Sequence, residues 1–242
     1  METKISPISK PAIWKTFERT TKEGKVKKFW TQNLLDDHKE LAMNYLLDHF
    51  MREEPLCSAL KMRETVDSSN ELCEIWQNML PQNCTLACYT VDDDMQEKLV
   101  GLNICYRNSQ SDDKIDYHDK TERTRKLMAF LDDILYTTEL YQRFGVDEYL
   151  GALGLFTVPE YRGYNIGFEL LDSRRYLCQT LGIRLSVTIF TGPASQRLAE
   201  KAGFRDVYPV SLDDIEARNP FLIIPGLRNF TNKIRLMYIL YD

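Results

Sequence analysis

The segment from Val158 to Phe168 carries the residue types of an anion-binding loop. It follows an apolar run, Leu150 to Thr157, that predicts a strand, and it leads into a predicted helix, Phe168 to Leu181. The first amides of a helix have no partner inside the helix, and the helix dipole adds partial positive charge at that end. A strand, a short loop with glycines and a helix start therefore predict a diphosphate site.

The spacing inside this loop excludes the two best-known phosphate motifs. No Gly-Lys-Ser/Thr follows, as in the Walker loop, and the glycines do not match G-x-G-x-x-G. What stands here is Arg162-x-x-Asn165-x-Gly167. Arg162 adds a permanent charge, and Gly163 and Gly167 allow close approach or a positive φ. Asn165 is the best residue after glycine for the left-handed region, so we expect the turn to keep its shape.

Carboxylates and hydroxyls elsewhere are candidates for acid–base chemistry. Glu53 and Glu54 stand at the C-terminus of a predicted helix, Asp36 to Arg52, and immediately precede Pro55. On sequence alone, a solvated surface side chain is the simpler interpretation of either glutamate. Thr191 and Ser195 follow another predicted strand and flank Pro193, so helix capping and catalysis both remain open for Thr191.

Composition limits the class of protein. The chain has 242 residues, 43% hydrophobic and 28% charged, which is typical of a globular α/β protein with a substantial core. A net charge of −5 disfavours a nucleic-acid partner. No signal peptide and no apolar run long enough for a membrane span are evident, so we expect no membrane contact and a cytoplasmic location. The six cysteines form no C-x-x-C pair and the three histidines are scattered, so we expect reduced cysteines and no metal site.

Hydrophobic periodicity predicts the elements that would position these residues. A second helix is expected from Glu71 to Leu80, capped by Ser69-Asn70, and a long amphipathic helix from Thr121 to Phe144. A short helix is expected from Pro193 to Ala202. Strands are predicted at 12–18, 26–31, 84–91, 99–106, 150–157, 183–190, 204–210 and 234–241.

This order of elements, together with three segments, resembles the GCN5-related N-acetyltransferases. The loop from Arg162 to Gly167 is similar to their (Arg/Gln)-x-x-Gly-x-(Gly/Ala) loop, with Asn165 where the family usually has glycine. His49 to Leu56 resembles the F-F-x-(D/E)-E-P-L segment of insect arylalkylamine N-acetyltransferases. Ser195-x-Arg197-x-x-Glu200-Lys201-x-Gly203-Phe204 resembles a second signature of that family.

The resemblance implies a fold and a co-substrate. The fold would be α/β, a mixed and mostly antiparallel twisted sheet of about seven strands flanked by helices, splayed at the central strands to hold coenzyme A (CoA). Residues 1–25 would be an N-terminal extension with an extra strand, and 26–242 a single acetyltransferase domain. Acetyl-CoA would be the co-substrate, and its contacts would come from Phe156, Thr157, Val158, Arg162, Gly163, Tyr164, Asn165, Ile166, Gly167 and Phe168.

The resemblance also implies the chemistry. A small primary amine, an arylalkylamine such as dopamine, octopamine, serotonin or tryptamine, would attack acetyl-CoA directly in a ternary complex, with Glu54 as general base. The negative end of the helix dipole before Pro55 would favour proton uptake by Glu54. An amide near Val158 would stabilise the oxyanion, and Thr191 and Ser195 would assist near the sulfur. Many relatives carry a tyrosine acid at the position of Ala199, so a phenol donor is absent there.

Other functions remain open at this stage. The alternative acceptors are a polyamine, agmatine or a protein amine, and the alternative function is binding of acyl-CoA without catalysis. We expect no nucleic-acid partner and a monomer.

Overall fold

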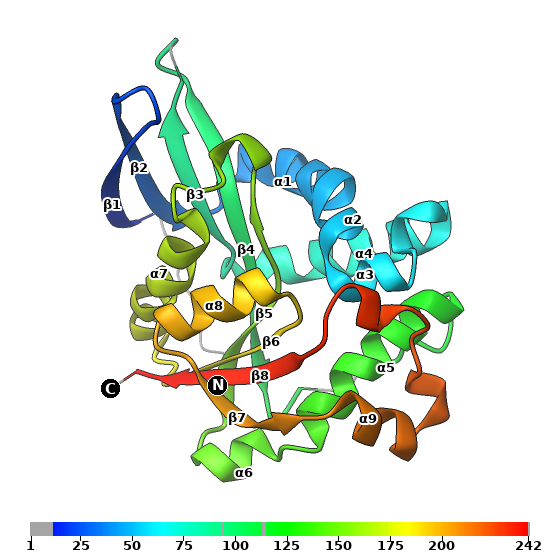
Figure 1. Cartoon of the computed structure of the whole chain (residues 1–242). Helices are drawn as coiled ribbons and strands as arrows, with labels where there is room; N and C mark the ends of the chain where they lie inside the picture. Colours follow the sequence, from blue (N-terminus) through cyan, green and yellow to red (C-terminus); the bar gives the residue numbers. More distant parts are fainter. Residues whose placement is uncertain (1–11, 93, 113–114, 242) are drawn as a thin grey trace.

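One open sheet of eight strands forms the centre of the molecule (Figure 1). The computed structural model describes residues 12–92, 94–112 and 115–241. The strands lie in the order β1-β2-β3-β4-β5-β6-β8-β7. Their bounds are β1 Ile13–Thr20, β2 Val26–Asn33, β3 Leu86–Val91, β4 Glu97–Ser109, β5 Glu148–Thr157, β6 Leu185–Phe190, β7 Arg205–Val210 and β8 Ile234–Leu240.

All neighbouring strands pair antiparallel except β5 and β6, which run parallel. The β5–β6 ladder holds one pair, Leu150 with Ser186, near the start of both strands. Toward Thr157 and Phe190 the two strands have no registered pairs, so the sheet is split there. The expected splay between the central strands is confirmed, and the strand count is eight rather than about seven.

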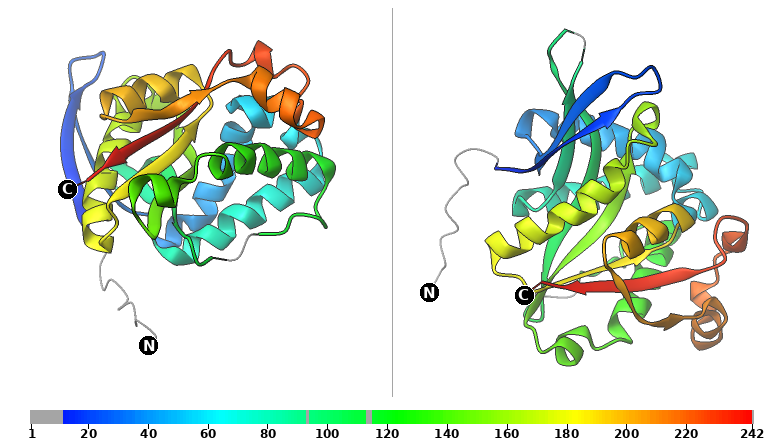
Figure 2. Two further views of the ribbon diagram at one scale, coloured as in Figure 1. Left: turned by 90° about the horizontal axis from the view of Figure 1, so that it is seen from below. Right: turned by 60° about the vertical axis from the view of Figure 1, so that its left-hand side comes forward.

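Helices cover both faces of this sheet (Figures 1 and 2). Helices α7 and α8 pack against each other on one face, while α1 to α5 gather on the other. The α-helices are α1 Lys39–Tyr45, α2 Met51–Glu53, α3 Pro55–Ala59, α4 Val66–Met79, α5 Glu122–Tyr136, α6 Leu140–Phe144, α7 Ile166–Leu181, α8 Pro193–Lys201 and α9 Leu212–Arg218. A π-helical turn, Leu46–Phe50, joins α1 to α2 and places an extra residue in the helix just before Glu53 and Glu54.

Several helix boundaries differ from the sequence-based expectation. Helix α4 begins at Val66, so Ser69 and Asn70 lie inside it rather than capping it. The predicted long helix is broken, because Glu139 adopts a left-handed conformation between α5 and α6. Helix α9 was not predicted, because its short sequence has too few apolar residues for a clear period.

Close packing fixes helix α7 over the split in the sheet. Gly101 on β4 lies so near the start of α7 that an added Cβ would sit 2.7 Å from Ile166 Cγ2. At the other side of the helix start, a Cβ on Gly167 would meet Leu198 of α8 at 2.8 Å. Both glycines therefore allow contacts that bring the N-terminus of α7 to the sheet and to α8.

The N-terminal hairpin β1–β2 extends the sheet and holds α7 from outside. Lys15 of β1 lies 2.5 Å from Glu169 Oε2 and 2.7 Å from Asp172 on α7. Arg19 pairs with the other oxygen of Glu169 and donates through Nε to the Tyr164 carbonyl at 3.1 Å. Glu169 is only 3% exposed, so its charge depends on these two cations.

The described residues contain neither a helix of membrane-spanning type nor a metal-binding group of side chains. Within them, no helix has both the length and the apolar character that crossing a bilayer requires. In the same part of the chain, no cluster of histidine, cysteine and carboxylate side chains is arranged as a metal site.

We expect replacement of both Lys15 and Arg19 by methionine to lower the free energy of unfolding by about 3–5 kcal/mol, because it leaves a buried carboxylate without a cation. Urea denaturation measures this loss. Adding Glu169→Leu to the double variant should restore most of the stability, whereas Lys28→Met, which removes an exposed pair with Glu18, should change it by less than about 1 kcal/mol. A double variant as stable as the parent would contradict this role of the hairpin.

Candidate active site

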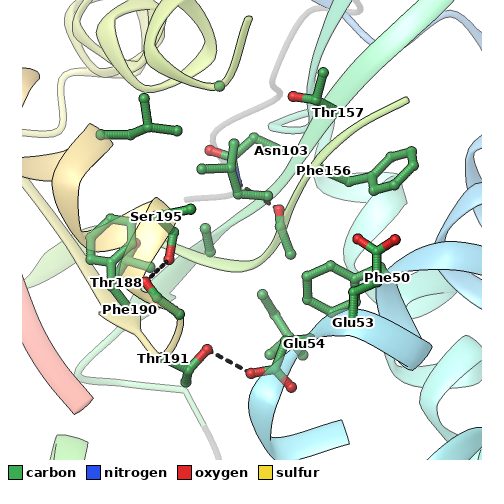
Figure 3. A pocket seen from close by; sticks show the side chains of 18 of the residues that line it. Phe50, Glu53, Glu54, Asn103, Phe156, Thr157, Thr188, Phe190, Thr191 and Ser195 are labelled. Carbon is green, nitrogen blue, oxygen red and sulfur yellow. Dashed lines mark hydrogen bonds between the residues drawn. The ribbon is translucent and has the colours of Figure 1, made fainter. Parts of the chain in front are cut away.

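A cavity of about 570 Å³ opens where β5 and β6 diverge (Figure 3). Its walls come from the two strand ends, the loop before α7, the α2–α3 junction and the start of α8. Ten of the site residues expected from the sequence line it: Glu54, Phe156, Thr157, Arg162, Gly163, Asn165, Ile166, Gly167, Thr191 and Ser195. The volume is in the range of small-molecule sites.

The loop before α7 forms a nest of free amides at one end of this cavity. Gly163 has φ +93° and Asn165 has φ +64°, and such alternation turns successive N–H groups to one side. Within the described residues, no backbone acceptor pairs with the amides of Gly163, Asn165, Ile166 or Gly167. The N-terminus of α7 thus offers converging donors to an anion.

Asn165 takes the left-handed conformation that was predicted for it (φ 64°, ψ 21°). Its side-chain oxygen accepts a hydrogen bond from Lys201 Nζ at 3.3 Å, which links the loop to the end of α8. Replacing glycine by asparagine in the loop therefore leaves the turn intact.

Arg162 is paired across the mouth of the cavity. Its Nη2 lies 2.5 Å from Glu53 Oε2, and both side chains are about half exposed. An anion that enters the nest and contacts Arg162 therefore competes with Glu53.

Glu54 is held at the opposite wall by two donors. One carboxylate oxygen, Oε2, accepts the Cys57 amide at 2.7 Å, and the other, Oε1, accepts the Thr191 hydroxyl at 2.6 Å (Figure 3). The expectation that Glu54 ends a helix is incomplete, because it is also the N-cap of α3. The Cys57 amide and the Thr191 hydroxyl thus fix the position of both Glu54 oxygens at the start of α3.

Thr191 and Ser195 occupy different roles at the start of α8. Gly192 is the N-cap, so the buried Thr191 bonds to Glu54 instead of capping the helix. Ser195 Oγ donates to the Gly192 carbonyl at 2.9 Å while lining the cavity. Thr191 therefore joins β6 to the α2–α3 junction across the cleft.

Three of the expected contact residues do not line the cavity. The Val158 amide donates to the Val100 carbonyl at 3.0 Å within the sheet, so it is not available to a ligand. Because amides alternate along a strand, the Thr157 amide faces the gap instead. Tyr164 packs on Phe29, and Phe168 lies under the ammonium groups of Lys15 and Lys201.

Comparison with solved structures gives this arrangement its context. A putative arylalkylamine N-acetyltransferase 7 from the yellow fever mosquito is similar, with 27% identity, a TM-score of 0.87 and 96% coverage of each chain. Arylalkylamine N-acetyltransferase 2 from Aedes aegypti (17% identity, TM-score 0.73) and a Drosophila melanogaster polyamine N-acetyltransferase that forms N-acetylagmatine (17%, 0.69) share the fold over 88% of this chain and 99% of theirs. No protein-family model and no curated protein matches the sequence.

The chain has the fold of the GCN5-related N-acetyltransferases, and it is similar to solved insect arylalkylamine N-acetyltransferases. It is thus an acyltransferase enzyme that acts on an amine.

The acetyltransferase also has cavity residues that sequence reasoning missed. An apolar arm reaches between the helices and is lined by Phe50, Leu56, Leu72, Trp76, Leu127 and Leu131. A polar group at the closed end of the split consists of Asn103, Arg174 and Thr188. Hydrophobic periodicity predicted the helices that carry most of these apolar residues, but period alone does not separate a pocket wall from a core.

Cys57 lines the cavity beside Glu54 without being a nucleophile. Burial and the neighbouring carboxylate raise the pKa of its thiol well above the ordinary value, so it stays protonated. All six cysteines are free, and all but Cys73 are buried.

We expect Asn165→Ala to lower the free energy of unfolding by about 1–2 kcal/mol, because alanine is strained in the left-handed region, and Asn165→Gly to change it little. Chemical denaturation compares the two. Asn83, which is exposed and left-handed far from the cavity (φ 52°), is the matched control, and Asn83→Ala should show a similar loss. Equal stability of Asn165→Ala and Asn165→Gly would contradict the strain argument.

Proposed function

We propose that this enzyme transfers the acetyl group of acetyl-CoA to a small primary arylalkylamine, by direct attack in a ternary complex with Glu54 as general base. One observation carries the proposal. The cavity has a nest of free amides at one end and a carboxylate fixed by Thr191 at the other, with an apolar arm beside it.

The nest fits the pyrophosphate of CoA. Four unpaired amides at a helix start, in Gly163, Asn165, Ile166 and Gly167, supply donors without a side-chain counter-charge. Arg162 adds a cation once it leaves Glu53. The split between β5 and β6 gives the pantetheine arm a strand edge, with Phe156 and Thr157 in its wall.

Glu54 is suited to take a proton from the amine. A primary amine with a pKa of about 10 is almost wholly protonated at neutral pH and has no free electron pair to attack with. The carboxylate has roughly four lone-pair sites, and Cys57 and Thr191 use two of them. The remaining sites receive the proton from the ammonium group, directly or through water.

The Thr157 amide is our candidate for stabilising the oxyanion. It faces the gap between the strands, and removal of one such donor costs about 3–4 kcal/mol in other enzymes. Ser195 also lines the cavity, at the start of α8.

The apolar arm favours an aromatic acceptor. Phe50 and Trp76 meet edge to face, with ring centroids 5.9 Å apart, and leucines complete the wall. Among the described lining residues, the carboxylates are Glu53 and Glu54, and Glu53 is engaged with Arg162. A solved relative named as an arylalkylamine N-acetyltransferase agrees with this choice.

A second candidate acceptor is agmatine or a polyamine, which carries another cation. Binding of CoA through Arg162 would release Glu53, whose carboxylate would then face the mouth of the cavity. A panel of tyramine, dopamine, tryptamine, agmatine and spermidine, assayed for CoA thiol release with acetyl-CoA, distinguishes the two. Release with none of them, despite measurable CoA binding, would favour a protein that binds acyl-CoA without catalysis.

We expect Glu54→Gln to lower kcat/KM by about a hundredfold or more at pH 7, because the amide cannot take up a proton, while the same change at Glu53 has little effect. Glutamine keeps an oxygen that accepts the Cys57 amide, so α3 retains its cap, and its NH2 group donates to the Thr191 hydroxyl. Between pH 6.5 and 9.5, the difference in kcat/KM between this variant and the parent enzyme should become smaller, because a growing fraction of the amine is already deprotonated in solution. Equal losses in the two variants would remove Glu54 from this role.

Glu53→Gln should strengthen CoA binding about two- to fivefold, because it frees Arg162 from an exposed ion pair whose contribution is at most about 1 kcal/mol. Calorimetric titration with CoA measures the change. Arg162→Gln combined with Glu53→Gln should abolish the gain. If Glu53→Gln leaves the affinity unchanged or weakens it, Arg162 does not contact the cofactor.

A further inference from the structure

Arg174 places a fully buried guanidinium in the wall of the cavity, at the closed end of the split. It belongs to α7 and reaches toward the sheet. Its Nε donates to Asn103 Oδ1 at 2.8 Å, and Nη1 donates to the hydroxyls of Thr188 at 2.7 Å and Ser186 at 3.3 Å. The side chain therefore spans β4 and β6 near the single β5–β6 pair.

The charge of Arg174 has no carboxylate partner among the described residues. All its acceptors are neutral, and the buried Nη2 has no hydrogen-bond partner in that part of the chain. The carboxylates on the same helix, Glu169 and Asp172, are paired with Lys15, Arg19 and Arg175.

The other titratable groups near Arg174 are neutral at physiological pH. Burial raises the pKa of the Cys178 thiol to about 12, and it also raises the pKa values of Cys105 and Tyr106 on β4 and of Tyr241 after β8. The guanidinium also lies 5.6 Å from the centre of the Phe204 ring, which is uncharged. A buried cation without an anion is costly, so a negative charge that enters the cavity is strongly attracted to it.

Arg174 is too far along α7 to serve the amide nest. It follows Ile166 by eight residues, which is about 12 Å along the helix axis. The other cation that lines the cavity in the described residues, Arg162, stands at the nest and is paired with Glu53. The closed end of the split therefore has its own positive charge.

The reaction creates a negative charge that needs such a partner. Glu54 takes one proton from the ammonium group and passes it to solvent, and the amine nitrogen then forms a bond to the thioester carbon. The C–S bond breaks with its electron pair on sulfur, and the second proton that leaves the nitrogen as the amide forms goes to Glu54. The hydroxyls beside Arg174 do not supply a proton, because Ser186 donates to Leu150 O and Thr188 to Val187 O. At the open end of the split, Thr191 donates to Glu54 and Ser195 to Gly192 O. Sulfur therefore leaves as a thiolate.

We propose that Arg174 stabilises the CoA thiolate as the leaving group, an inference that rests on the proposed acetyl transfer. Asn103 and Thr188 hold the guanidinium at the end of the gap in which the pantetheine arm would lie. The proton that the thiolate finally takes comes from solvent after CoA departs.

The pKa of the CoA thiol in the complex tests this role without turnover. A cysteine thiol has an ordinary pKa of about 8.5, and the thiol of free CoA, measured in the same buffers, is the reference. An apolar cavity and the carboxylates of Glu53 and Glu54 raise it, whereas a nearby cation lowers it by about 1–3 pH units. Thiolate absorbance of enzyme-bound CoA, titrated from pH 5.5 to 10, should therefore give a value at least about one unit below that of free CoA.

Variants separate Arg174 from the rest of the site. Arg174→Gln should raise the pKa of the bound thiol to or above that of free CoA and lower kcat by about tenfold or more, while Arg174→Lys keeps most of the shift. Arg175→Gln, on the exposed side of the same helix, removes an equal charge and should change neither quantity.

The outcomes are distinct. A thiol pKa in wild-type enzyme at or above that of free CoA overturns the inference, whether or not the variants fold. A lowered pKa that Arg174→Gln leaves unchanged overturns it too, and assigns the effect to the amide nest and the α7 dipole. Absence of CoA binding by wild type would instead refute the proposed function.

Discussion

The missing ladder between β5 and β6 is the constraint on which the site depends. In most sheets the backbone donors of a central strand are hydrogen-bonded to both neighbouring strands. Between β5 and β6, however, only Leu150 and Ser186 are paired. Beyond them the edge of β5 turns its Thr157 amide to a cavity rather than to a neighbouring strand. Helix α7 contacts the sheet at both ends of the split. At the closed end its Arg174 bridges β4 and β6, and at the open end its first residues pack on Gly101 of β4.

Adjacent glutamates acquire different roles because a helix ends between them. Glu53 is the last residue of α2 and turns outward to Arg162, whereas Glu54 is extended and caps α3. Pro55 enforces this change, since it excludes helical geometry at the residue before it and favours the first position of the next helix. One carboxylate is thus exchangeable at the mouth of the cavity, and the other is fixed by Cys57 and Thr191.

Local chemistry is what the sequence predicted well. The conformation of Asn165, the free amides around it and the break at Pro55 depend on residue type and immediate neighbours, so they are readable without the fold. The positions of the eight strands along the chain also followed from periodicity. The break at Glu139 and the early start of α4 were missed, because tertiary packing overrides weak local preference at such boundaries.

The site features that could not be predicted from the sequence depend on contacts between residues that are far apart in the chain. The Glu54–Thr191 bond joins residues 137 positions apart, and Arg174 meets Asn103 across 71 positions. Nothing in the local pattern marks Arg174, which stands beside Arg175 on an amphipathic helix, yet one is fully buried and the other is half exposed. A buried arginine becomes tolerable only because β4 and β6 present Asn103, Ser186 and Thr188 to it, and those strands are far apart in the chain. Because these acceptors are neutral, they do not neutralise the charge of Arg174. The buried guanidinium, which could not be predicted from the sequence, therefore makes the closed end of the split positive.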